Sequence, residues 1–220
     1  MKIETFGYRG NFVFTAPSLS SNASGELMVA ATPYGNRSDL ESCLSEFLNE
    51  FEKQSSDLDS TSPYPKLTCF SDYENLIYTT VQFLNDYIYS NHNKDKVNLG
   101  CDFFCLYKVE KVIYFTQIGW PAVLLNKNGN TLPICSDFSF APKDKSESPY
   151  LPTSVLGLES SINIKIQQID ISDSSDVLLF KSNDSPDTLM SIYPTDLSVI
   201  ANSYAEVNPE QGLWLGKISL

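Results

Sequence analysis

Residues that could perform catalysis or bind a metal are few in this sequence and lie far apart. The 220 residues include five cysteines and a single histidine, His92. A structural zinc site needs four thiolate or imidazole ligands close together, and only Cys101 and Cys105 are near one another in sequence. We therefore expect reduced, buried thiols rather than a zinc site. His92 lies in a polar turn with no nucleophile beside it, so we do not expect it to act as a catalytic base.

The charge of the chain excludes several classes of partner. It carries 15 basic and 27 acidic residues, a net charge of −12, and its two arginines are Arg9 and Arg37. A nucleic-acid-binding protein needs a basic surface, and an anionic membrane surface would repel this chain. A basic protein partner is electrostatically favoured. The sequence shows no signal peptide and no run of about 18 apolar residues, so we expect a cytoplasmic protein.

In the first half of the chain, the residue pattern predicts two helices preceded by short strands. Aromatic and β-branched residues predict a strand over 2–15, and the apolar run 26–31 predicts another, which the following Thr-Pro-Tyr-Gly-Asn segment breaks. Apolar residues at helical spacing predict a helix that begins at Ser38, where Glu41 completes a capping box. A second amphipathic helix is predicted from Tyr73 to Tyr89.

In the second half, the pattern predicts an antiparallel meander. The dipeptide Asn128-Gly129 is typical of a two-residue hairpin turn, and Thr195 is a plausible cap for a short helix over 194–205. Long meanders with helices in two groups indicate one α+β layered domain over 1–220 rather than a doubly wound parallel one. The predicted strands cover 101–109, 111–118, 121–126, 131–135, 162–169, 176–181 and 213–220.

Several local motifs, in this order along the chain, resemble those of the metal-dependent (PPM, type 2C) protein phosphatases. Leu156-Gly157 resembles the family's Leu-Gly element, and the segment Asp176 to Asp184 resembles its strand ending in Ser-Asp-Gly. The resemblance covers nearly the whole chain. It implies a four-layer α/β/β/α sandwich with a central antiparallel β-sandwich. Further positions that match the family's turns and hairpin are Gly100, Gly119, Ala122, Gly129 and Asp137.

The resemblance also implies a two-metal centre, for which this sequence lacks ligands. The family holds two Mg²⁺ or Mn²⁺ ions with about four aspartates, and the ions activate a water. Two dications facing one or two carboxylates would be poorly neutralised, so we expect no metal cofactor. Asp184, Asp187 and Glu210 are weak candidates for a single-ion site. The degenerate metal-site positions are Val13, Thr32, Pro33, Asn183, Asp184 and Glu210.

Other residues at or near the matching positions suggest binding rather than catalysis. Arg9 resembles the arginine with which the family grips substrate phosphate, and it is the candidate phosphate-binding residue. The alternative for Arg9 is a surface residue paired with an acid. Phe12, Tyr34 and Trp120 place apolar bulk where the family has charged or small residues. That bulk would either fill the emptied metal cavity or form an aromatic anchor for a partner.

We therefore expect a pseudophosphatase, a catalytically inactive phosphatase-like domain that acts in signalling through protein–protein contact. One alternative is an active Ser/Thr phosphoprotein phosphatase that uses Mg²⁺ or Mn²⁺ with displaced ligands. A second is a non-hydrolysing module that binds a phosphorylated partner through Arg9. The displaced ligands of the first alternative would come from Asp39, Asp102, Asp137, Asp184, Asp187 and Glu210.

Overall fold

The computed structural model describes residues 1–8, 15–57, 62–127, 130–135, 154–171, 175–182, 196–207, 209–210 and 212–220. Within these residues the fold is α+β, with two five-stranded antiparallel sheets and three α-helices, which confirms the predicted fold class. The chain divides into two compact units, each assembled from separate segments. The first unit comprises 1–16, 119–153 and 171–220, and the second comprises 17–118 and 154–170.

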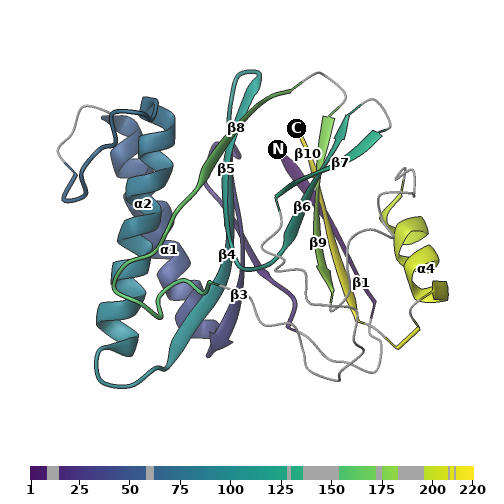
Figure 1. The fold of residues 1–220 in the computed structure, drawn as a ribbon, viewed down its shortest axis with the longest axis horizontal. Helices are drawn as coiled ribbons and strands as arrows, with labels where there is room; N and C mark the ends of the chain where they lie inside the picture. The colour runs from purple at the N-terminus through teal and green to yellow at the C-terminus, as the bar shows by residue number, and fades with distance from the viewer. Residues whose placement is uncertain are drawn as a thin grey trace. The chain divides into compact units, whose positions relative to one another are not determined.

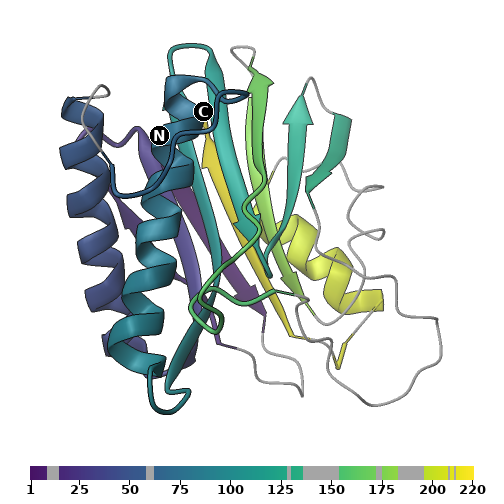
Figure 2. The same cartoon turned by 60° about the vertical axis from the view of Figure 1, so that its left-hand side comes forward.

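The second unit is a pair of helices packed on one face of a five-stranded sheet (Figure 1). The helices α1 (Arg37–Ser56) and α2 (Asp72–Ile88) lie side by side, and a π-helical segment, η1 (Tyr89–Asn93), directly follows α2 (Figure 2). In spatial order the strands are β2 (Ser18–Ser21), β3 (Leu27–Gly35), β4 (Leu99–Val109), β5 (Val112–Ile118) and β8 (Ile166–Asp170).

The core of the second unit lies between these helices and the sheet. Strand residues alternate between faces, and β4 turns Cys101, Phe103 and Cys105 toward the apolar side of the helices. The rings of Phe47 and Phe103 meet edge-on with centroids 5.3 Å apart. Burial of one such side chain contributes about 1.5–3 kcal/mol, so this face holds the helices in place.

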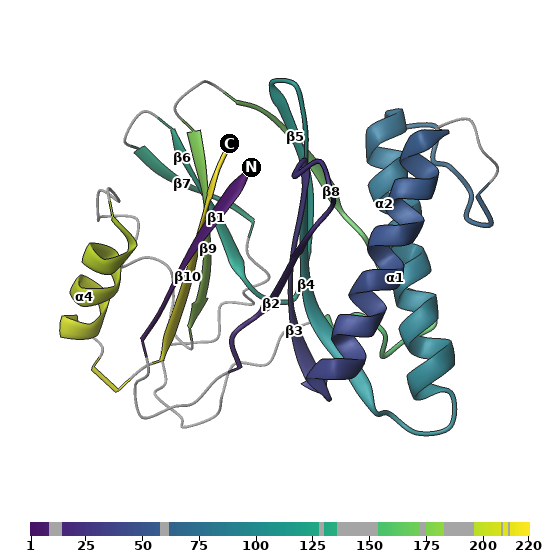
Figure 3. The same cartoon turned by 180° about the vertical axis from the view of Figure 1, so that it is seen from behind.

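The first unit is a sheet on which one described helix, α4 (Leu197–Val207), packs (Figure 3). Ile200 and Tyr204 of α4 belong to the same buried cluster as Phe180 and Leu215 of the sheet. Lys2 pairs with Ser219, so the two ends of the chain lie together. In spatial order the strands are β1 (Lys2–Tyr8), β10 (Leu213–Ser219), β9 (Ser175–Ser182), β6 (Ala122–Lys127) and β7 (Asn130–Cys135).

Helix starts differ from the predicted ones. Helix α1 is capped by Asn36, whose side-chain oxygen accepts the backbone N–H of Ser38 at 3.1 Å, so the prediction of Ser38 as the cap was wrong. A capping box does occur at α2, between Ser71 and Glu74. Helix α4 begins after Asp196, whose carboxylate accepts the backbone N–H of Ser198 at 2.8 Å. The predicted cap Thr195 lies outside the described residues.

Strand ends differ as well. Strand β3 continues to Gly35, because residues 32–35 pair with residues 99–102 of β4, so the predicted break after residue 31 was wrong. The short strand β2 lies inside the predicted loop 16–25. Asn128 and Gly129 lie outside the described residues, but Lys127 pairs with Asn130, which leaves two residues for the predicted hairpin turn.

The described residues also bear on the membrane and thiol predictions. Among them, no helix combines the length and apolar character that crossing a membrane requires. Cys43, Cys101 and Cys105 are free and buried, as predicted. Cys69 is free and exposed, so the prediction of a buried thiol was wrong there. The side chain of Cys135 lies outside the described part.

Candidate functional site at the ends of β3 and β4

Thr32, which we predicted from the sequence to correspond to a metal-ligand position of the phosphatase family, lies inside a regular strand. It is 3% exposed, and its partner across the ladder is Asp102 of β4. Pro33, the next degenerate position, pairs with the buried Cys101. The segment that would form a metal-binding turn is therefore β-ladder here, and its Thr32 hydroxyl brings no negative charge.

Asp102 is a fully buried carboxylate at this site, with 0% of its surface exposed. The hydroxyl of Tyr34 donates to it and lies 3.0 Å from both Oδ1 and Oδ2. Burial raises the pKa of Tyr34 well above its ordinary value of 10.0, and the charge of Asp102 and the hydrogen bond raise it further. The phenol therefore keeps its proton at neutral pH and donates it to the carboxylate.

These side chains do not fit the two divalent ions of the phosphatase family. Thr32 offers a neutral oxygen, and the carboxylate of Asp102 accepts the phenol of Tyr34. In the part of the chain that the structure describes, no three His, Cys, Asp or Glu side chains are grouped so that they could hold a metal. Without several carboxylates at one place, the charge of two dications is not neutralised.

In the first unit, strand ends that adjoin other candidate positions meet at one end of the sheet. Tyr8, Leu213 and Ser182 are register partners across β1, β10 and β9. The hydroxyl of Tyr8 donates to the backbone carbonyl of Pro209 at 2.9 Å, which ties the turn before β10 to the end of β1.

The sequence neighbours of these three strand residues include several predicted site residues. Arg9 follows Tyr8, Asn183 follows Ser182, and Glu210 directly follows Pro209. Of these three candidates the structure describes Glu210, which is exposed. The roles of the others stay predictions. The candidate residues outside the described part are Arg9, Phe12, Val13, Asp137, Asn183, Asp184 and Asp187.

The two described aromatic residues near the matching positions differ in exposure. Trp120 is 8% exposed, whereas Tyr34 is 38% exposed. The burial of Trp120 favours a packing role for it. Tyr34 keeps its ring accessible while its hydroxyl is held by Asp102, so it is the one that favours the anchor interpretation.

Sequence reasoning missed a contact between the only histidine and a buried cysteine. His92 Nε2 lies 3.5 Å from Cys43 Sγ, although 49 positions separate the two residues in sequence. Burial, followed by the charge of Asp39, raises the pKa of Cys43 to about 11. A thiol with a raised pKa is a poor nucleophile at neutral pH, so this pair has the properties of a packing contact between α1 and η1.

Two buried asparagines hold the Leu156-Gly157 element against the start of β4. Asn93 donates to the carbonyls of Leu99 and Gly157, the latter at 2.7 Å. Asn85 accepts the backbone N–H of Gly157 at 2.9 Å. Leu156 pairs with Cys101 through two backbone hydrogen bonds. The predicted element therefore borders the site as a structural clamp.

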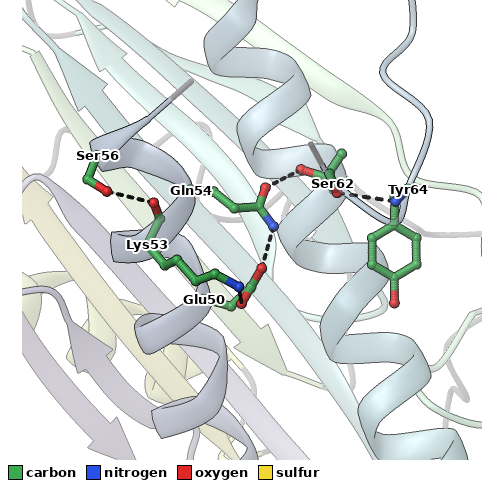
Figure 4. Close-up of polar contacts among 7 residues, drawn as sticks. Glu50, Lys53, Gln54, Ser56, Ser62 and Tyr64 are labelled. Atoms are coloured by element: carbon green, nitrogen blue, oxygen red, sulfur yellow. Dashed lines mark hydrogen bonds and ion pairs between the residues drawn. The ribbon is translucent and has the colours of Figure 1, made fainter. Parts of the chain in front are cut away.

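A second polar cluster joins the C-terminal end of α1 to α2 (Figure 4). Gln54 donates to Glu50 at 2.9 Å and accepts the hydroxyl of Thr79 at 2.7 Å. Gln54 and Thr79 line a shallow hollow together with Asp57, Lys66 and Asp72, among others. Because the buried amide of Gln54 is bonded on both sides, this cluster connects the two helices.

Replacing Tyr34 with phenylalanine is expected to lower the free energy of unfolding by about 1–2 kcal/mol, because a buried carboxylate loses a hydrogen bond. Urea denaturation near neutral pH measures the change. The folded state raises the pKa of Tyr34, so this stabilisation is fully present below pH 10.0 and is lost as the pH rises through the folded pKa.

A matched control is Tyr64→Phe, which removes a 3.0 Å hydrogen bond to the half-buried Asp86. The Tyr64 variant is expected to lose less stability than the Tyr34 variant, since its carboxylate partner keeps access to water. A stability difference between the parent chain and Tyr34→Phe that grows as the pH rises above 10 would contradict the assigned pKa direction.

The two antiparallel sheets and their helices match the fold of the PPM Ser/Thr phosphatases. One similar structure is the serine/threonine phosphatase PstP/Ppp of Mycobacterium tuberculosis, which is 12% identical in sequence. The match covers 98% of this chain and 97% of the phosphatase chain, with a TM-score of 0.64. The serine/threonine phosphatase of S. agalactiae is also 12% identical, with coverages of 100% and 99% and a TM-score of 0.65. The PPM Ser-Thr phosphatase MsPP of Mycobacterium smegmatis, in complex with cacodylate, is 14% identical, with coverages of 100% and 98% and a TM-score of 0.63.

At such low identity the likeness shows the fold alone. No family model matches this chain, and no curated protein matches it.

Proposed function

We propose that this chain is a non-catalytic phosphatase-like domain that acts through protein–protein contact. The observation that carries the proposal is the pairing of Thr32, Tyr34 and Asp102. A buried neutral hydroxyl stands at a position matching a metal ligand, and a tyrosine phenol donates to both oxygens of the buried carboxylate opposite. The likeness of the fold to solved phosphatase structures supports the phosphatase-like part of the proposal.

The physical argument is one of charge neutralisation. A pair of dications that activates water needs several anionic oxygens around it. Asp102 accepts a hydrogen bond from a protonated phenol, which lies 3.0 Å from both carboxylate oxygens. Of the three weak single-ion candidates, the structure describes Glu210, which is exposed. The domain would then act by binding a partner protein through its exposed surface rather than by catalysis.

The test combines turnover and metal binding. With Mn²⁺ or Mg²⁺ present, the purified chain is expected to release no phosphate from p-nitrophenyl phosphate or phosphopeptides beyond a blank. The same ions are expected to leave the melting temperature unchanged, whereas an ion at 100 times its Kd would raise it by roughly 5–10 °C.

The active-phosphatase alternative predicts the opposite pair of results. Metal-dependent turnover that disappears in Glu210→Ala or Asp102→Asn would sink the proposal, since it would show those carboxylates at work as ligands. The PPM phosphatase MsPP of Mycobacterium smegmatis, assayed in parallel, shows that the conditions detect turnover.

A further inference from the structure

Some exposed apolar residues belong to chain segments that adjoin the candidate site. The described part of the chain has seven exposed large apolar residues, and three of them belong to the segments at this end of β3 and β4. These are Tyr34, Val97 and Leu158, with exposed fractions of 38%, 63% and 36%. We call these three residues the apolar corner. Single exposed apolar residues are common, but gathered ones mark interaction surfaces.

Two glycines mark where the segments that carry the apolar corner approach each other closely. Tyr34 pairs with Gly100, and a Cβ on Gly100 would lie 2.9 Å from Leu158 Cδ2. Leu158 therefore covers the strand directly beside Tyr34. A Cβ on Gly35 would lie 2.3 Å from the carbonyl oxygen of Asn98, so Val97, one residue earlier, adjoins the end of the same strand.

Hydrogen bonds hold the residues beside the apolar corner in place. The hydroxyl of Tyr34 is held by the fully buried Asp102. Asn85 donates to the carbonyl of Glu159 at 3.0 Å and so fixes the residue after Leu158. A preorganised aromatic side chain loses little conformational freedom on binding, which is the property of an interface anchor.

Charge decides which partner suits this surface. The chain carries a net charge of −12, so a second copy is repelled and a basic segment is attracted. Glu159 adjoins Leu158 and Asp39 lies in the first turn of the helix that follows Tyr34, while Lys96 precedes Val97. An arginine can place its planar guanidinium on a tyrosine ring, and acidic neighbours strengthen that contact.

We propose that the apolar corner docks a basic segment of a protein partner, with an arginine on the ring of Tyr34 and an apolar neighbour against Leu158 and Val97. The inference rests on the proposed function, to which it adds a contact surface and a partner chemistry. It needs no metal and no reaction step.

The experiment selects short random peptides on the immobilised chain. Enriched peptides are expected to contain arginine next to an apolar residue and to bind at least about tenfold more weakly to Tyr34→Ala, the loss typical of an aromatic anchor. Leu158→Ser is expected to weaken the same peptides while leaving the Tyr34–Asp102 bond in place. Leu132→Ser, an exposed apolar residue of β7 in the first unit, is the matched control and is expected to change nothing.

Salt gives a second readout. Raising the ionic strength from about 0.1 M to about 1 M shortens the Debye length from about 10 Å to about 3 Å and should weaken a basic peptide. Circular dichroism checks that each variant is folded. If Tyr34→Ala does not fold, the binding test relies on Leu158→Ser.

Four outcomes would overturn the docking site: no enriched peptide, enrichment of acidic or phosphorylated peptides, equal loss in Leu132→Ser, or Tyr34-dependent self-association in sedimentation. Metal-dependent phosphatase turnover would instead overturn the proposed function, so the two failures are distinguishable.

Discussion

Replacing Asn93 with alanine is expected to lower the free energy of unfolding by about 3–4 kcal/mol, because it leaves several buried backbone groups without a partner. Asn93 is 7% exposed. Its side-chain oxygen accepts the backbone N–H groups of Asn98 at 2.8 Å and Leu99 at 3.0 Å. Its amide nitrogen donates to the carbonyls of Leu99 and Gly157. One side chain thus joins the end of η1 to the start of β4 and to the Leu156-Gly157 element.

Urea denaturation measures this loss, and an unchanged m-value would locate it in the native state. Asn91→Ala is the matched control, since Asn91 is an exposed residue of the same π-helical segment and should change stability by less than about 0.5 kcal/mol. Asn93→Asp keeps the acceptor and removes the donor, so it should also destabilise the chain. Equal stability of Asn93→Ala and Asn91→Ala would show that the clamp does not support the fold.

Periodicity was sufficient to predict most elements, because long apolar patterns reflect the faces that the core requires. The helix from Tyr73 and the hairpin around Asn128-Gly129 are examples, each with a clear repeat or turn signal. The local sequence was not sufficient to predict the residue at which α1 begins. Asn36 and Ser38 are both good caps, and local sequence cannot rank them. The position of the last strand residue, Gly35, decides in favour of Asn36, and that position depends on pairing with β4.

The extent of β3 illustrates how tertiary pairing overrides a local signal. Pro33 and Gly35 indicated a break, since proline lacks an N–H and glycine weakens strands. Strand β2, however, pairs only with residues 28–31 of β3. Among the strands that the structure describes, Pro33 therefore has a neighbour on one side only, β4, and such edge positions tolerate proline.

The residue types at the predicted site positions can be read from the sequence, but the contacts that these residues make cannot. Thr32 and Tyr34 could be identified as neutral and aromatic residues at the predicted positions. Asp102 was only one of six candidate displaced ligands, and the prediction favoured Asp184, Asp187 and Glu210 over it. The Tyr34–Asp102 bond joins residues 68 positions apart and depends on strand register. One signal was present: an aspartate inside the apolar run of β4 must be buried, and a buried carboxylate requires a hydrogen-bonding partner.

Replacing Gly35 with alanine is expected to lower the free energy of unfolding by about 2–4 kcal/mol, because the new side chain has no room and the backbone conformation disfavours it. Gly35 has a φ of +136°, which L-residues rarely adopt. A Cβ there would lie 2.3 Å from the carbonyl oxygen of Asn98 and 3.3 Å from the Cα of Leu99. Both are backbone atoms, so the clash cannot be relieved by a side-chain rotation.

Gly7→Ala is the matched control, because a Cβ on Gly7 would meet its nearest neighbour, the carbonyl oxygen of Leu213, at 4.0 Å. Urea denaturation gives the free energy of unfolding of both variants. It thus compares a glycine where a Cβ would clash with one where a Cβ has room. Gly35 was predicted from the sequence to stand opposite a glycine of the phosphatase family's metal-binding turn, and that prediction offers a competing, catalytic explanation for this glycine. If only Gly35→Ala lowers the free energy of unfolding strongly, the close approach of two backbone segments explains why glycine stands at this position. A neutral Gly35→Ala would remove that explanation and strengthen the case for ligand contact at this strand end, as the active-phosphatase alternative requires.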